Sequence, residues 1–201
     1  MNIKIGLLYP SRLTLYGESG NVKALQYYFK KQEIDASIEY IDDLKSVDLN
    51  KFDFLYMGSG LHSGLNFAEN NLTQNKDKVM DYIENGGLFL ATGNSMRAFK
   101  NYKYFKCTTN DDYYVADVQA KYLDGKIGVR AFQNTKYLVS GVENPVFELF
   151  NGFGNDGSKK EGFRYNNLIV TSLIGPILAI NAELRNHFID RIKEKHGNNT
   201  K

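Results

Sequence analysis

Cysteine is almost absent from this chain: Cys107 is the only one among its 201 residues. No disulfide can form within the chain, and this suits a reducing cytosol. Long apolar runs are also missing. The apolar segment at residues 3–8 is too short for a signal peptide or a membrane span. No other run approaches the roughly 18 residues that a membrane helix needs, so we expect a cytoplasmic protein that does not cross a membrane.

The chain also has little excess charge of either sign. Its 25 lysines and arginines against 23 aspartates and glutamates give a net charge of +2. So small an imbalance gives no reason to expect binding to nucleic acid or to an anionic membrane surface. Repeats and linkers rich in proline, glycine or serine are absent as well. We therefore predict a single domain at residues 1–196 and a frayed tail at residues 197–201.

The first half of the chain alternates short apolar runs with segments of helical spacing. Strands are predicted at residues 3–8, 37–41, 54–57 and 88–91. Helices are predicted at residues 19–31 and 70–84, and a short one follows the turn Thr92-Gly93-Asn94. This order predicts an α/β fold in three layers, with helices flanking a largely parallel central sheet.

The second half of the chain has a different pattern. Residues 113–122, 126–132 and 137–140 are typical of strands, with turns expected at residues 124–125 and 134–135. These segments should add antiparallel strands to the fold. A further strand is predicted at residues 168–172 and a final helix at residues 181–195.

Ligands of open parallel sheets bind beyond the carboxyl ends of the strands. Three such ends stand out in this chain. They are Gly58-Ser59-Gly60, Thr92-Gly93-Asn94 and the segment that follows Ser172. We expect a functional site where these segments meet.

Five segments carry a resemblance to a known family. They are residues 15–21 (Leu-Tyr-Gly-Glu-Ser-Gly-Asn), 141–144 (Gly-Val-Glu-Asn), 152–157 (Gly-Phe-Gly-Asn-Asp-Gly), 161–167 (Glu-Gly-Phe-Arg-Tyr-Asn-Asn) and 171–178 (Thr-Ser-Leu-Ile-Gly-Pro-Ile-Leu). In these segments the chain resembles the class I glutamine amidotransferases of the cobyric acid synthase type, which include the amidotransferase subunits of lipid II isoglutaminyl synthases. The resemblance covers almost the whole chain and implies their flavodoxin-like α/β fold.

The resemblance implies a cysteine nucleophile at a tight strand-to-helix turn. The family's turn reads roughly Leu-Ala-x-Cys-Gly-Gly-x-Gln, whereas residues 90–97 read Leu-Ala-Thr-Gly-Asn-Ser-Met-Arg. Gly93 stands at the position of the nucleophile, Asn94 at that of a glycine and Arg97 at that of the glutamine. Ile174 stands where the family's Thr-x-Leu-His-Gly-Pro has its histidine. A hydrocarbon side chain cannot accept a proton, so the general base is lost as well.

A third landmark of the family, Gly-Gly-Gly-Gln-Asp, reads Gly-Ser-Gly-Leu-His at residues 58–62. We therefore predict no catalytic residue. What the resemblance leaves is a vestigial pocket formed by Gly58, Ser59, Gly60, His62, Asn94, Ser95 and Arg97. No metal site is predicted, because His187 and His196 have no second ligand at a useful spacing. No cofactor is predicted either.

The resemblance also implies a partner. Family members of this type release ammonia, which a Mur-family ligase uses to amidate a peptidoglycan precursor. The chain could be a degenerate amidotransferase-like protein that binds or regulates a Mur-ligase-like protein. It could instead be an amide hydrolase with a relocated site at His62, Ser95 and Arg97. A third possibility is a sensor of a small glutamine-like or glutamate-like ligand, in which Arg97 pairs with a carboxylate.

Overall fold

The structure is a computed structural model that describes residues 1–102 and 105–199. Its main sheet has six strands in the order β2-β1-β3-β4-β10-β9. They are β1 (Asn2–Leu8), β2 (Asp35–Ile41), β3 (Phe54–Met57), β4 (Leu88–Thr92), β9 (Phe163–Tyr165) and β10 (Leu168–Thr171). Neighbouring strands run parallel, except that β9 is antiparallel to β10.

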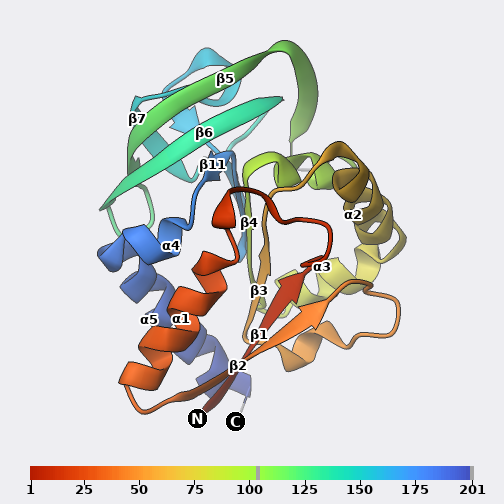
Figure 1. Cartoon of the computed structure of the whole chain (residues 1–201), viewed down its shortest axis with the longest axis vertical. Helices are drawn as coiled ribbons and strands as arrows, with labels where there is room; N and C mark the ends of the chain where they lie inside the picture. Colours follow the sequence, from red (N-terminus) through yellow and green to blue (C-terminus); the bar gives the residue numbers. More distant parts are fainter. Residues whose placement is uncertain (103–104, 200–201) are drawn as a thin grey trace.

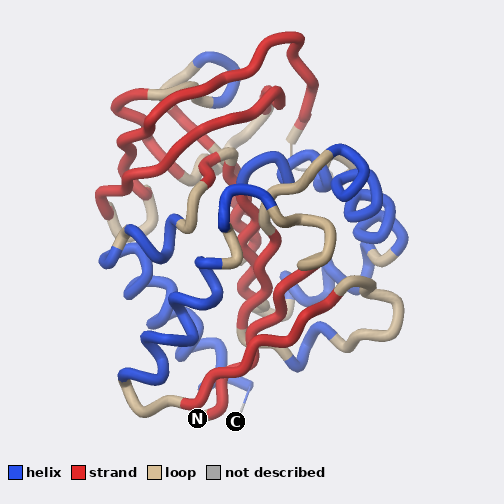
Figure 2. The backbone as a smooth tube through the Cα atoms, viewed as in Figure 1, coloured by secondary structure: helices blue, strands red, loops and turns tan. Residues whose placement is uncertain are grey.

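Helices cover both faces of this sheet (Figure 1). One face carries α1 (Gly20–Lys31), α4 (Ile177–Ile180) and α5 (Ala182–Asn199), and the other carries α2 (His62–Gln74) and α3 (Lys76–Glu84) (Figure 2). Every residue of β3, β4 and β10 is buried. Strands that are covered on both faces lack the polar alternation of half-exposed strands. The predicted three-layer α/β fold is therefore confirmed.

Each helical layer forms a hydrophobic core with one face of the sheet. Val22, Leu25 and Phe29 repeat at helical spacing along α1 and pack in one core with Phe188 of α5. Val79 of α3 belongs to the second core, which lies under α2 and α3. The apolar stripes of amphipathic helices therefore select the faces that become buried.

A second sheet is wholly antiparallel and has five strands in the order β11-β6-β5-β7-β8. They are β5 (Lys106–Tyr122), β6 (Ile127–Ser140), β7 (Phe147–Asn151), β8 (Lys160–Glu161) and β11 (Leu173–Ile174). This sheet lies over the edge of the main sheet at which β1, β3 and β4 end (Figure 1). The expectation of antiparallel strands in the second half is thus confirmed. The second sheet covers the strand ends at which the site is predicted.

Two of the predicted elements are wrong. The predicted helix at residues 70–84 is two helices, because the chain leaves helical geometry at Asn75 (φ −110°, ψ 24°), whose side chain donates to the Asn71 carbonyl. Asparagine competes for backbone hydrogen bonds in this way and favours helix ends. The predicted turn at residues 134–135 is also wrong, because Asn134 and Thr135 pair with Val115 and Tyr114 inside a continuous β6.

Several boundaries also differ from the prediction. β5 begins at Lys106 rather than at residue 113. α5 ends at Asn199 rather than at residue 195, so residues 197–199 are helical and residues 200–201 of the predicted tail lie outside the described residues. The strands β7, β8, β9 and β11 were not predicted. None of the described helices combines the length and the apolar character required to cross a membrane.

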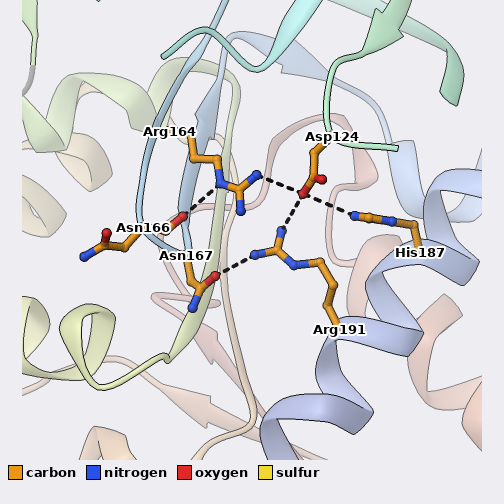
Figure 3. A network of polar contacts seen from close by, with 6 residues as sticks. All are labelled: Asp124, Arg164, Asn166, Asn167, His187 and Arg191. Carbon is orange, nitrogen blue, oxygen red and sulfur yellow. Dashed lines mark hydrogen bonds and ion pairs between the residues drawn. The ribbon is translucent and has the colours of Figure 1, made fainter. Parts of the chain in front are cut away.

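An ionic network joins the two sheets through the turn between β5 and β6. One oxygen of Asp124 lies 2.8 Å from Arg164 on β9, 3.5 Å from His187 and 3.6 Å from Arg191 on α5 (Figure 3). Arg191 also donates to the side chain of Asn167 at 2.6 Å. Partial burial alone would raise the pKa of Asp124. The nearby positive charges of Arg164, Arg191 and His187 outweigh it and lower that pKa.

We predict that Asp124→Asn destabilises the fold by less than about 1 kcal/mol at neutral pH, because the carboxylate is partly exposed and solvent screens its charge. Since the folded-state pKa is lowered, the stabilisation is present above the ordinary pKa of an aspartate. It disappears as the pH falls through the lowered value. Urea unfolding at several pH values measures both effects. Asp111→Asn, on the exposed part of β5, is the matched control, and an equal loss in the two variants would contradict a role of the network.

Candidate functional site

Gly93 lies at a sharp turn between sheet and helix. It follows β4 directly and opens the short 3-10 helix η3 (Gly93–Phe99). Its φ is +64°, which glycine adopts at little cost and other residues avoid. In hydrolases a turn of this kind lifts the nucleophile above the end of the sheet. Gly93 thus lies where a nucleophile could be presented, but it has no side chain.

The space beside Gly93 is filled by two other side chains. A Cβ atom built on Gly93 would lie 2.0 Å from the Oγ of Ser59 and 2.5 Å from the Cγ2 of Ile174. Ser59 follows β3, and Ile174 belongs to β11, so three strand ends converge at this point. Both side chains are buried. The positions that the resemblance assigns to the nucleophile, the histidine and the glycine loop are therefore in contact.

The carboxamide of Asn94 binds the backbone of the neighbouring loop. The N–H of Gly60 donates to its Oδ1 at 3.1 Å, and its Nδ2 donates to the carbonyl of Gly60 at 2.9 Å. Backbone N–H groups at such loops stabilise the negative oxygen that develops during acyl transfer. Here the N–H of Gly60 is already engaged within the chain.

Ser95 lies apart from the other polar residues of the predicted pocket. It is fully buried, and its hydroxyl donates to the carbonyl of Thr92 at 2.7 Å. It does not line the cleft described below. The structure therefore does not bring Ser95 together with His62 and Arg97, as the relocated hydrolase site would require.

Arg97 is held in place by side chains of α2. Its Nε lies 3.0 Å from Glu69, its Nη2 donates to Asn66 at 2.5 Å, and its Nη1 lies 3.3 Å from the Nδ1 of His62. Lys100 binds the other oxygen of Glu69 at 2.6 Å. His62 is the first residue of α2. Arg97 and Lys100 share the carboxylate of Glu69, which is buried.

Glu18 lies behind the turn and was not predicted as a site residue. Its carboxylate accepts hydrogen bonds of 2.5 Å from the N–H of Ser59 and from the hydroxyl of Thr92, which itself lies 2.6 Å from the hydroxyl of Tyr56. Burial raises its pKa to about 7, although the hydrogen bonds from Ser59 and Thr92 oppose the rise. Glu18 also packs beside Gly58, whose built Cβ would lie 3.2 Å from it. The segment at residues 15–21 was a signal for Glu18, but its burial cannot be read from the sequence.

A cleft of about 910 Å³ opens beside the turn, under the hairpin of β5 and β6. Four residues of the predicted pocket line it, namely Gly60, His62, Asn94 and Arg97. The other lining residues come from the short 3-10 helix at Leu15–Gly17, from α2 and the residue before it, from the C-terminal cap of η3 and from the hairpin. Gly58 and Ser59 are buried and do not line the cleft.

The remaining candidates for chemistry are unsuited to it. Burial raises the pKa of the Cys107 thiol to about 11, so the reactive thiolate is scarce at neutral pH. Among residues 1–102 and 105–199, no three histidines, cysteines or carboxylates are grouped closely enough to hold a metal ion.

The sequence and the fold were compared with those of known proteins. No family model matches the chain. It is 27% identical to the lipid II isoglutaminyl synthase (glutamine-hydrolyzing) subunit GatD of Staphylococcus aureus, over 92% of this chain and 82% of that protein. It is 22% identical to the GatD subunit of Streptococcus pneumoniae, over 97% of this chain and 82% of that protein.

The fold is also found among solved structures. A glutamine amidotransferase from Thermotoga maritima superposes with a TM-score of 0.61 at 11% identity, covering 100% of this chain and 86% of the other. The chain therefore has the class I glutamine amidotransferase-like fold and is a distant homologue of the GatD subunit of lipid II isoglutaminyl synthase.

Proposed function

We propose that this chain is a degenerate glutamine amidotransferase-like protein that does not hydrolyse glutamine and that binds or regulates a Mur-ligase-like partner in cell-wall precursor amidation. The observation that carries this proposal is the turn at Gly93. It has the form that presents a nucleophile but carries no side chain, and Ser59 and Ile174 occupy the space above it.

The missing groups are those on which hydrolysis depends. Gly93 offers no sulfur, and Ile174 offers no nitrogen that could accept a proton. Loss of a nucleophile or of its base costs about 10⁶-fold in turnover in a well-studied hydrolase. The engaged N–H of Gly60 removes a further means of stabilising the transition state.

Ser95 and Cys107 are poorly placed to act as a replacement nucleophile. The hydroxyl of Ser95 is buried and bonded to a carbonyl, and the Cys107 thiol keeps its proton at neutral pH. These placements weigh against the relocated hydrolase site. They favour a protein that retains the family scaffold for binding.

The partner is inferred from the homology. The curated relatives are subunits of a synthase, and the family resemblance implies that the other component is a Mur-family ligase. We accordingly expect this chain to act in the cytoplasm beside such a ligase.

Copurification from the native host tests the partnership. We expect an affinity-tagged chain to recover a protein with the sequence of a Mur ligase, and the complex to elute as one species when the two purified proteins are mixed. An unrelated protein with the same tag is the control. Recovery of no such ligase from cells that contain one, with no complex on mixing, would contradict the proposed partnership.

A further inference from the structure

The cleft beside Gly93 is lined by positively charged side chains and by no negatively charged ones. Arg97 and Lys100 line it from η3 and its C-terminal cap, and Lys136 lines it from β6. None of the lining residues is an aspartate or a glutamate. Glu69 balances one of these charges from behind the cleft, so about two positive charges remain uncompensated. Positive charge therefore exceeds negative charge in and around this cleft.

The cationic groups are positioned before any ligand arrives. Three groups on α2 hold the guanidinium of Arg97, and they engage three of its five N–H groups at most. The ammonium of Lys136 lies 4.7 Å from the centre of the Tyr113 ring and forms no ion pair among residues 1–102 and 105–199. Groups that are already ordered lose less entropy on binding.

The floor of the cleft leaves little for a glutamine amide to bind. The N–H and the carbonyl of Gly60 already form two hydrogen bonds with Asn94. The cleft also offers the guanidinium of Arg97 and the ammonium groups of Lys100 and Lys136 to a ligand. The volume of about 910 Å³ falls within the range of small-molecule sites.

From this arrangement we infer that the cleft binds a small molecule with at least two negative charges, carried by phosphate or carboxylate groups. Charge-assisted hydrogen bonds from arginine and lysine are the strong interactions available to such a ligand. The binding requires neither a partner protein nor the loss of glutamine hydrolysis. It can therefore fail or succeed independently of the proposed function.

Calorimetric titration of the purified chain tests this inference with three probes. Pyrophosphate and 2-oxoglutarate distinguish a phosphate ligand from a dicarboxylate, and glutamine serves as a probe without net charge. We expect saturable binding of at least one of the two anions and no comparable binding of glutamine. The affinity should fall as salt is added, because salt screens the charges.

Variants of the lysines locate the site. Lys136→Gln and Lys100→Gln should each weaken binding of the anion about tenfold, which is the typical effect of losing one charge-assisted contact. Lys23→Gln, on the exposed face of α1, is the matched control and should leave the affinity unchanged. No binding of either anion at millimolar concentration would overturn the inference. So would binding that both cleft variants leave unaltered, or glutamine binding as tight as that of the anions.

Discussion

We expect the Gly93→Cys variant to have a free energy of unfolding about 3 kcal/mol lower than that of the unchanged protein. A cysteine there would be held at a φ of +64°, a conformation that costs residues other than glycine about 1–2 kcal/mol. Its Cβ would also lie 2.0 Å from the Oγ of Ser59 and 2.5 Å from Ile174, and overpacking of a buried site costs about 1–3 kcal/mol. Urea unfolding of both proteins measures the difference.

Two further variants separate these causes. Gly17 has the same φ of +64°, with no atom within 4 Å of a Cβ built on it, so Gly17→Cys reports the backbone cost alone and should lose less stability. Adding Ser59→Gly to Gly93→Cys should restore part of the loss, and the coupling appears in a double-mutant cycle. If Gly93→Cys were as stable as the unchanged protein, or no coupling with Ser59 were found, the close packing at the turn would be refuted.

The second large effect concerns Glu18 and pH. Its pKa rises from the ordinary 4.5 to about 7 in the folded protein, so the folded state holds this proton more firmly than the unfolded state does. The contribution of Glu18 to stability is therefore most favourable below pH 4.5. It falls as the pH rises towards 7, by a total of roughly 3 kcal/mol.

The Glu18→Gln variant should lose most of this pH dependence, because glutamine stays uncharged and keeps an oxygen that can accept from Ser59. Unfolding curves recorded at intervals between pH 4.5 and 8 measure the effect. Glu161 is also buried with a raised pKa, so some slope should persist in the variant. Glu194→Gln, exposed on α5, is the control. A slope that Glu18→Gln and Glu194→Gln change equally would rule out Glu18 as its source.

The pattern of apolar residues predicts much of this fold and fails at identifiable places. The run at residues 54–57 predicts β3 correctly, because a strand buried on both faces is continuously apolar. Asn134 and Thr135 have the chemistry of a turn, yet pairing with the neighbouring strand keeps them in β6. Propensity is local, whereas cross-strand pairing depends on residues distant in sequence.

The candidate site shows the same limit. The family resemblance predicts from sequence alone that Gly93 and Ile174 belong to the site, because both lie in short motifs. The hydrogen bonds between the Asn94 side chain and the Gly60 backbone form only when the ends of separate strands meet, and so does the burial of Glu18. A local sequence pattern therefore cannot predict them. The ion pair of Arg97 with Glu69, which Lys100 shares, is likewise a contact between separate helices. It makes Arg97 a less simple partner for a ligand carboxylate than its sequence position indicates.

Release of ammonia from glutamine tests the loss of hydrolytic chemistry most directly. The unchanged protein should be assayed at saturating glutamine beside a protein-free blank and an active class I glutaminase. We predict a rate equal to that of the blank, and the same rate for Ser95→Ala, because Gly93 and Ile174 supply neither a nucleophile nor a base. A reproducible rate above the blank that follows the protein through purification would contradict the proposal that this active site is empty.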